Sequence, residues 1–242
     1  MSAASGGSGR LGAGDVAVVI PARNEAERIH ATVTAAAGLA SVGLVVVVDD
    51  GSADATADVA RRAGAAVMRH TRNRGKGAAM ETGAEAVRLV DQRERRESPR
   101  HLLFLDADLA GTAAMAGPLA EPVIAGKADM TIAVFTTTVK LGGHGLVVGL
   151  SGAGIRRATG WQPRQPLNGQ RCLTRAAFEA ARPLAHGWGA ETGLTIDLLR
   201  GGLRVTEVEV DLAHRATGTG LHAQLHRAHQ LADVARALAA RR

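Results

Sequence analysis

Apolar residues along this chain come in short runs separated by longer stretches of helical periodicity. The short runs are rich in Val, Ile and Leu, as in strands buried on both faces of a sheet, and comprise residues 15–20, 44–48, 65–69, 101–105 and 129–134. The longer stretches place apolar side chains at helical spacing, and comprise residues 25–39, 53–63 and 76–90, with a further helix before the fifth run. This alternation predicts an α/β fold with a mainly parallel central sheet flanked by helices.

The second half of the chain has a less regular pattern. Residues 141–160 are glycine-rich and mix apolar with basic side chains, and residues 162–170 contain Pro163 and Pro166. We expect loop and short helix there rather than regular sheet, in a mobile segment. Beyond it, the periodicity predicts helices at 175–181 and 190–199, a strand at 203–210 and an amphipathic terminal helix at 221–238.

The composition indicates a single compact domain. With 242 residues, of which 46% are hydrophobic, the chain can bury one core. Residues 1–14 are rich in Gly, Ser and Ala, so we expect a disordered leader before a domain spanning 15–242.

The single cysteine, Cys172, excludes an internal disulfide and fits a reducing compartment. No apolar run approaches the roughly 20 residues of a membrane-spanning helix, and we expect a cytoplasmic protein.

The net charge of +6 favours anionic partners. A nucleotide, a phosphorylated small molecule and anionic lipid headgroups all fit this charge. Nucleic acid is not expected, because only 2% of residues are aromatic and no stacking platform or binding motif is present.

Two acidic clusters directly follow apolar runs. Asp106 and Asp108, separated by one alanine, follow the fourth run, and Asp49 and Asp50 follow the second. Ligands of parallel sheets bind beyond the carboxyl ends of the strands, so both clusters are expected to face one crevice. Carboxylates two residues apart suit a hard cation such as Mg²⁺ or Mn²⁺ that also binds a diphosphate. A solvated turn or a helix cap is the alternative for the first cluster.

The neighbouring loops carry candidate nucleotide contacts. Asp50 can accept hydrogen bonds from a base or ribose, whereas Ser52 and Asp54 are explained by helix capping alone. Residues 21–25, Pro-Ala-Arg-Asn-Glu, either form a plain turn or line a nucleotide pocket with their backbone and Asn24. Residues 72–77 combine cations with small residues before a helix, which suits an approaching phosphate, although the spacing is not that of a Walker loop.

Four motifs in order resemble family 2 glycosyltransferases and their GT-A relatives. They are Val-Val-Ile-Pro-Ala-Arg-Asn-Glu at 18–25, Val-Asp-Asp-Gly-Ser at 48–52, Arg-Gly-Lys-Gly at 74–77 and Asp-Ala-Asp at 106–108. The resemblance covers roughly 16–215 and implies a GT-A fold with a nucleotide-sugar donor. It assigns the donor's binding to Pro21, Ala22, Asn24, Glu25, Asp50, Ser52, Gly75, Lys76 and Asp106. It implies Mg²⁺ or Mn²⁺ at Asp106 and Asp108, with Asp108 also taking part in catalysis.

The second half is similar to glucosyl-3-phosphoglycerate synthases and, less closely, to polyprenyl-phosphate mannose synthases. The similarity lies in Gly-Trp-Gly-Ala-Glu-Thr-Gly-Leu at 187–194 and Asp-Leu-Ala-His-Arg at 211–215. It implies that Glu191 faces the acceptor and the sugar and that His214 completes the metal or diphosphate shell. Arg171 resembles an arginine by which relatives hold an acceptor. The chain is shorter than the phosphoglycerate enzymes, and residues 141–170 do not match their acceptor loop securely.

These resemblances divide the expected domain into a nucleotide-sugar-binding half at 15–110, an acceptor-binding half at 111–215 and a C-terminal amphipathic helix at 216–242. They predict transfer of a hexose from a UDP-glucose or GDP-mannose type of donor to a small phosphorylated or carboxylate acceptor such as 3-phosphoglycerate. The alternative acceptor is a polyprenyl phosphate at the membrane surface. The terminal helix is expected to pack on its own domain or on a second subunit of a homodimer, and peripheral membrane contact is the alternative.

Alternatives remain for the stereochemical outcome of the transfer and for the class of protein. Inversion requires a general base, for which Glu191 is the candidate, whereas in retention the leaving diphosphate can accept the proton. The rival classes are a sugar-phosphate nucleotidyltransferase and a non-catalytic nucleotide-sugar-binding protein. The first usually has a glycine-rich, Arg-containing loop after the first strand, where this chain has residues 21–25, and the second does not need Glu191.

Overall fold

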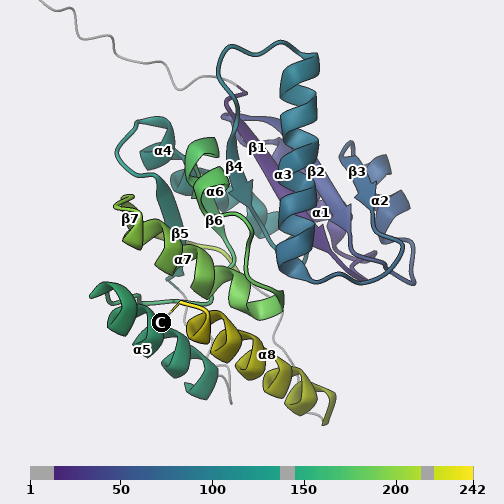
Figure 1. Cartoon of the computed structure of the whole chain (residues 1–242). Coiled ribbons are helices and arrows are strands. Elements are labelled where there is room, and N and C mark those ends of the chain that lie inside the picture. The colour runs from purple at the N-terminus through teal and green to yellow at the C-terminus, as the bar shows by residue number, and fades with distance from the viewer. Residues whose placement is uncertain (1–13, 137–144, 214–220, 242) are drawn as a thin grey trace, which may run out of the picture.

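The computed structural model describes residues 14–136, 145–213 and 221–241 (Figure 1). In this part of the chain a seven-stranded sheet has the order β3-β2-β1-β4-β6-β5-β7. The strands are β1 Val16–Ala22, β2 Val42–Asp49, β3 Ala66–Arg69, β4 His101–Phe104, β5 Met130–Phe135, β6 Arg171–Leu173 and β7 Val205–Val210. All neighbours pair in parallel except β6, which is antiparallel to both β4 and β5.

Helices connect the strands and cover both faces of the sheet. They are α1 Ile29–Ala37, α2 Thr56–Arg62, α3 Lys76–Arg93, α4 Gly117–Ile124, α5 Gly145–Thr159, α6 Arg175–Ala180, α7 Ala190–Arg200 and α8 Leu221–Ala239, with short 3₁₀ turns η1 Ala110–Ala116 and η2 Gly187–Gly189. The parallel α/β architecture and its flanking helices confirm the predicted fold class.

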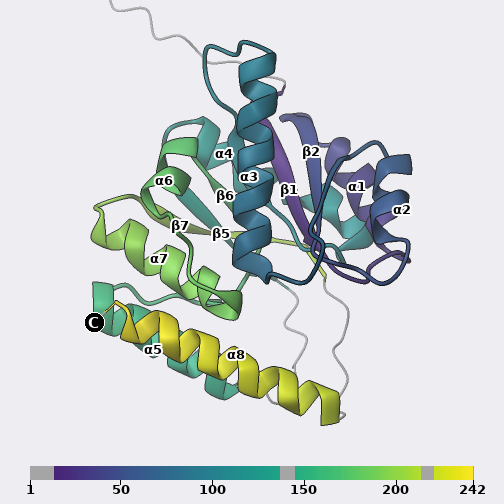
Figure 2. The ribbon, with the colours of Figure 1, turned by 45° about the vertical axis from the view of Figure 1, so that its right-hand side comes forward.

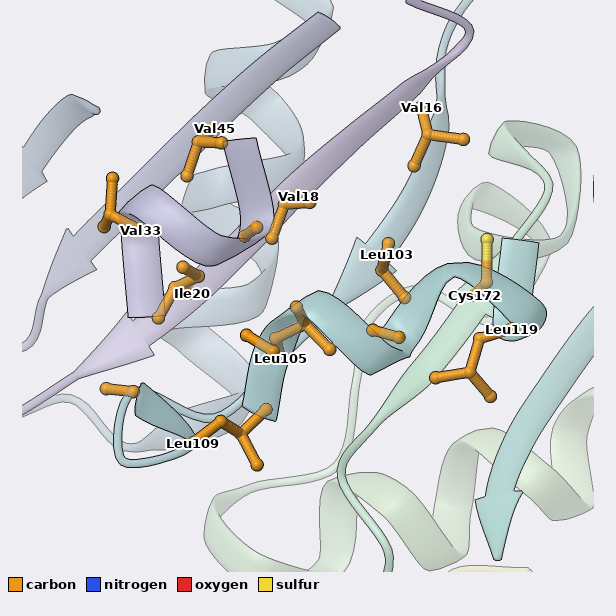
Figure 3. Close-up of a cluster of buried hydrophobic side chains, with 14 of the residues drawn as sticks. Val16, Val18, Ile20, Val33, Val45, Leu103, Leu105, Leu109, Leu119 and Cys172 are labelled. Atoms are coloured by element: carbon orange, nitrogen blue, oxygen red, sulfur yellow. The ribbon is translucent and has the colours of Figure 1, made fainter. Parts of the chain in front are cut away.

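The core is divided between the two faces because successive side chains of a strand point to opposite sides. On one face, Val18, Ile20 and Leu103 pack with α1, η1 and α4 (Figure 3). On the other, Val19 and Phe104 pack with α3, α6 and α7. The rings of Phe104 and Phe178 lie 5.5 Å apart between centroids. Burial on both faces explains why the strands read as continuous apolar runs.

A further layer lies beyond α7. Helices α5 and α8 run side by side there in both views (Figures 1 and 2), and both contact α7. A Cβ on Gly154 of α5 would lie 2.3 Å from Leu238 Cδ2, so this glycine permits the close approach of α8. None of the helices in the described ranges is long and apolar enough to cross a membrane.

The second half differs from the sequence prediction in two elements. The prediction of only short helix within 141–160 is wrong, because α5 has 15 residues. Its glycines disfavour an isolated helix, but contact with α8 compensates. Strand β6 was also missed, since its three residues follow a proline-rich loop and carry too little pattern. The other predicted helices and strands are confirmed to within a few residues, apart from the first helix, which begins at Ile29 rather than near residue 25.

Candidate functional site

The candidate residues gather where the strands β1, β2 and β4 end. The loop after β1 lies against the loop after β2, since Asn24 N–H donates to Ser52 Oγ at 2.9 Å and Ala53 N–H donates to Asn24 Oδ1 at 2.9 Å. Glu25 N–H donates to Thr56 Oγ1 at 2.9 Å. Asn24 has a positive φ of 55°, a conformation that asparagine tolerates better than most residues. Asn24 and Ser52 therefore join the two loops, and Ser52 is not a helix cap.

The carboxylate of Asp50 organises the basic loop that precedes α3. Its Oδ1 lies 2.7 Å from His70 Nδ1 and accepts from Arg74 N–H at 2.8 Å, while Oδ2 accepts from Gly75 N–H at 2.8 Å. His70 Nε2 lies 2.9 Å from Thr82 Oγ1 on α3. Both carboxylate oxygens are thus engaged by the chain itself, and they fix the position from which α3 begins.

Asp49 is fully buried and bonded within the same region. Its Oδ1 accepts from Ser52 N–H at 2.9 Å, and its Oδ2 lies 3.0 Å from Arg69 Nε. Asp49 therefore stabilises the loop after β2. Beside this loop a shallow pocket of about 340 Å³ is lined by Gly51, Ser52, Arg69, His70 and Thr71.

Lys76, the first residue of α3, joins the two halves of the site. Its Nζ lies 2.7 Å from Asp106 Oδ1 and 2.9 Å from Glu191 Oε1. Burial acts to lower the pKa of Lys76, but the carboxylates of Asp106 and Glu191 outweigh it and raise the pKa above its ordinary value. The ammonium therefore stays charged and holds the loop after β4 next to the start of α7.

Glu191 is 1% exposed at the first turn of α7. Within the described residues, neither of its carboxylate oxygens accepts a hydrogen bond of good geometry, although Oε1 makes the ion pair with Lys76. A buried carboxylate with so few partners is costly in a purely structural role. This situation is common among residues that act on a ligand.

Gln170 holds the other side of Asp106. Its Oε1 accepts from Asp106 N–H at 2.8 Å, and its Nε2 donates to Asp106 Oδ2 at 2.6 Å. The preceding residue, Gly169, leaves room for the cluster, because a Cβ there would lie 2.3 Å from Lys76 Nζ. Asp106 is thus fixed by an ammonium on one oxygen and an amide on the other.

The geometry does not support the prediction that Arg171 holds an acceptor. The side chain is fully buried, and its guanidinium donates to Pro166 O at 3.0 Å, Asn168 O at 2.8 Å, Glu191 O at 2.9 Å and Thr195 Oγ1 at 2.8 Å. Burial lowers the pKa of Arg171 to about 10. Arg171 therefore acts within the fold, where it joins β6 to α7.

Comparison with known proteins agrees with this geometry. The family model described as "Glycosyl transferase family 2" matches residues 17–147, more than half of the chain. The chain belongs to glycosyl transferase family 2. The matched part contains both acidic clusters and Lys76, whereas Glu191 lies beyond it.

Two relatives match the chain at 28% and 38% sequence identity. The chain is 28% identical over 214 residues to "Glycosyltransferase AglJ" of Haloferax volcanii, covering 84% of this chain and 65% of that protein. It is 38% identical over 96 residues to an uncharacterized protein, MJ1222, of Methanocaldococcus jannaschii, covering 39% of this chain and 35% of the relative. The chain therefore spans about two thirds and one third of these relatives.

The structural neighbours include glucosyl-3-phosphoglycerate synthase of Mycobacterium tuberculosis. Its complex with phosphoglyceric acid matches with a TM-score of 0.74 at 26% identity, over 95% of this chain and 80% of that one. A complex of the same enzyme with Mn²⁺, UDP and phosphoglyceric acid gives 0.73 at 25% identity, over 94% and 79%.

The donor set fits the divalent cation that the family resemblance implies. Asp106 and Asp108 supply carboxylate oxygens, and Mg²⁺ is commonly held by one or two carboxylates together with substrate phosphates and water. A carboxylate has about four lone-pair sites, so a carboxylate oxygen can accept from Lys76 or Gln170 and still bind a cation. No cluster of three acidic, His or Cys ligands occurs among the described residues, and the predicted ligand His214 lies outside them.

The sequence interpretation missed three residues of this family 2 site. Gln170 lay in the segment predicted as loop, and His70 and Thr82 lay in a predicted strand-helix connection and helix. Their contacts join segments far apart in the chain, and no local sequence pattern predicts such contacts. Asp108 lies half-buried just after β4, as predicted from its position.

Proposed function

We propose that this chain transfers a hexose from a nucleotide-sugar donor to a small anionic acceptor. The observation that supports the proposal most directly is the position of Lys76, whose ammonium lies within 2.9 Å of both Asp106 and Glu191. It brings the expected diphosphate and metal side of the reaction next to the expected base. A binding protein does not need a buried carboxylate at Glu191, and a sugar-phosphate nucleotidyltransferase usually has a glycine-rich, Arg-containing loop where this chain has residues 21–25.

In the proposed site, each segment has one task. Asp106 and Asp108 hold the divalent cation, which supplies charge neutralisation for the leaving nucleoside diphosphate. Lys76 adds a positive charge next to the same diphosphate. The pocket beside Gly51 and Ser52 accommodates the base and ribose of the donor, and the loop held by Asp50 shapes its wall.

The transfer breaks the bond between the anomeric carbon and the diphosphate oxygen and forms one to an acceptor hydroxyl oxygen. The hydroxyl proton goes to Glu191 if the configuration inverts, or to the leaving diphosphate if it is retained. In the second case Glu191 orients Lys76 and the substrates. The identity of the anomer in the product, read by proton NMR, distinguishes the two.

The relatives supply the first substrates to test. Glucosyl-3-phosphoglycerate synthase has been crystallised with UDP-glucose, Mn²⁺ and phosphoglyceric acid, so we propose UDP-glucose as the donor and 3-phosphoglycerate as the acceptor. A polyprenyl phosphate is the second acceptor class. It is favoured by Leu146 and Leu150, which stand exposed one turn apart on α5.

The decisive measurement is calorimetry of UDP-glucose and GDP-mannose with and without Mn²⁺, on wild type and Asp108→Ala. We expect metal-dependent binding of one donor, lost in Asp108→Ala and kept in the control Asp58→Ala, whose carboxylate is exposed on α2. Transfer to 3-phosphoglycerate and to a polyprenyl phosphate in detergent then identifies the acceptor. Absence of nucleotide binding under every metal condition would overturn the proposal.

Unchanged transfer by Glu191→Gln would exclude this residue as the base. If wild type binds the donor but transfers nothing to either acceptor, the binding-protein alternative gains support.

A further inference from the structure

Gln170 is fully buried at the centre of the site, and both ends of its side-chain amide contact Asp106. A backbone N–H is always a donor, so the amide oxygen must face Asp106 N and the amide nitrogen must face the carboxylate. The two contacts close a ring that fixes both the backbone and the carboxylate of one residue.

The antiparallel strand β6 delivers Gln170 to this position. Phe104 of β4 pairs with Arg171 of β6, and one step further along the antiparallel register Gln170 comes opposite the residues that follow β4. On its other side, the carbonyl of Gln170 accepts from Ala133 N–H at 3.0 Å. Gln170 is therefore held between the end of β4 and β5.

A turn before β6 restrains Gln170 further. The Oδ1 of Asn168 accepts from Gln170 N–H at 2.9 Å, and Asn168 Nδ2 donates to Gln165 Oε1 at 3.0 Å. With both backbone groups bonded, the amide of Gln170 has little freedom to follow a moving carboxylate. The backbone from which the side chain extends is therefore fixed, and the amide restrains Asp106 from a fixed point.

We propose that Gln170 is a positioning residue that orients the Asp106 carboxylate for binding the divalent cation and the donor diphosphate. The inference rests on the proposed function of Asp106. Residues that hydrogen-bond to a metal ligand fix its direction, and their loss typically costs roughly 10- to 100-fold in metal affinity. Lys76 donates to Oδ1 and Gln170 donates to Oδ2, so the two contacts together hold the Asp106 carboxylate in one orientation.

The test measures Mn²⁺ binding in the presence of UDP, by the electron paramagnetic resonance signal of free Mn²⁺, on the full chain. Gln170→Met keeps the length and burial of the side chain but removes both hydrogen bonds. We expect its Kd for Mn²⁺ to rise by roughly 10-fold or more. In turnover we expect the KM for the donor to rise and kcat to fall. Gln92→Met, at an exposed position of α3, is the matched control and should bind as wild type does.

Asn168→Ala is the second variant, in case Gln170→Met does not fold. It removes the acceptor that holds Gln170 N–H while the amide remains, and we expect a smaller increase in the same Kd. Wild-type Mn²⁺ and UDP affinity in a folded Gln170→Met protein would overturn the inference, and so would wild-type affinity in Asn168→Ala if only that variant folds. If wild type itself binds no Mn²⁺ with UDP, the proposed function fails first and the inference fails with it.

Discussion

Burial decides the part that Arg171 plays. A guanidinium that faces a bound phosphate or carboxylate must keep donors free for it, whereas the donors of Arg171 are directed at backbone carbonyls and Thr195. Two of these acceptors, Glu191 O and Thr195 Oγ1, belong to α7, and the other two belong to the loop before β6. The side chain thus stabilises the junction between the loop before β6 and α7.

Replacing this side chain tests the structural role. Arg171→Met leaves several buried carbonyl groups without a donor, which should lower the free energy of unfolding by roughly 3 kcal/mol. Urea unfolding followed by circular dichroism measures the change. An unchanged unfolding free energy together with a raised KM for the acceptor would restore the acceptor role for Arg171.

The absence of a side chain at Gly169 allows the cluster around Lys76 to form. In Gly169→Ala the new Cβ would lie 2.3 Å from Lys76 Nζ and 3.2 Å from Asp106 Oδ1. Because the ammonium is the end of a flexible chain, it can move while the fold remains. We expect the transfer rate to fall roughly tenfold or more, because a charge-assisted hydrogen bond is lost. The Tm should change by less than about 4 °C.

Gly149→Ala is the control for the added methyl group. A Cβ at Gly149, exposed on α5, would meet nothing within 4 Å. This variant should keep full activity and become slightly more stable, since alanine favours a helix over glycine. An active Gly169→Ala enzyme would show that Lys76 need not lie beside Asp106.

Among the elements, α8 contacts the turn that leads into Glu191. Asp233 Oδ2 accepts from Trp188 N–H at 3.2 Å, and Arg241 Nη2 lies 2.5 Å from Asp197 Oδ2 on α7. The terminal helix therefore packs on its own domain through described contacts. Asp233 of α8 contacts the turn before α7, and Arg241, just beyond α8, contacts Asp197 within α7.

A methyl group at Gly189 should separate α8 from this turn. Its Cβ would lie 2.7 Å from the backbone oxygen of Asp233 and 2.8 Å from Ala237 Cβ, and neither atom can rotate away. Gly189→Ala should lower stability by roughly 1–3 kcal/mol through overpacking and reduce activity. Hydrogen exchange should become faster in α8 and at the start of α7, but not in β1 or β2. Equal protection in the variant and in wild type would contradict this.

The elements also show how far the sequence could be interpreted. The positions of Asp50, Asp106 and Lys76 were predictable, because a strand that ends in a carboxylate and a helix that begins with a lysine are local patterns. The burial of Arg171 and the contact between Gln170 and Asp106 were not. Both depend on β6, which is too short to recognise and pairs with β4 from more than 60 residues away.

At the scale of the whole molecule, His101 links stability to pH. It stands at the start of β4, where burial lowers its pKa below the ordinary value although Asp15 acts to raise it. The unfolded chain therefore takes up this proton at a higher pH than the folded one. The contribution to stability is complete above about pH 6.5 and is lost as the pH falls towards the lowered pKa.

His101→Gln should flatten this dependence. We expect the free energy of unfolding of the variant to fall less than that of wild type between about pH 7.5 and pH 5. Urea unfolding at several pH values measures both slopes. His30→Gln, at an exposed position of α1, is the control and should keep the wild-type slope. Equal slopes for wild type and His101→Gln would rule out the assignment.

The single antiparallel strand has a consequence for how the molecule is made. Strands β1 to β4 are synthesised first, and they are neighbours in the sheet. Strands β4 and β5 are not neighbours, because β6, residues 171–173, lies between them. Until these residues leave the ribosome, β4 exposes an unpaired edge and β5 has no partner on that side. Unpaired edges invite association between chains. A nascent chain of this protein is therefore most in need of a chaperone after β4 has emerged and before residues 171–173 emerge, and a gene cut between the two should yield fragments that associate rather than fold.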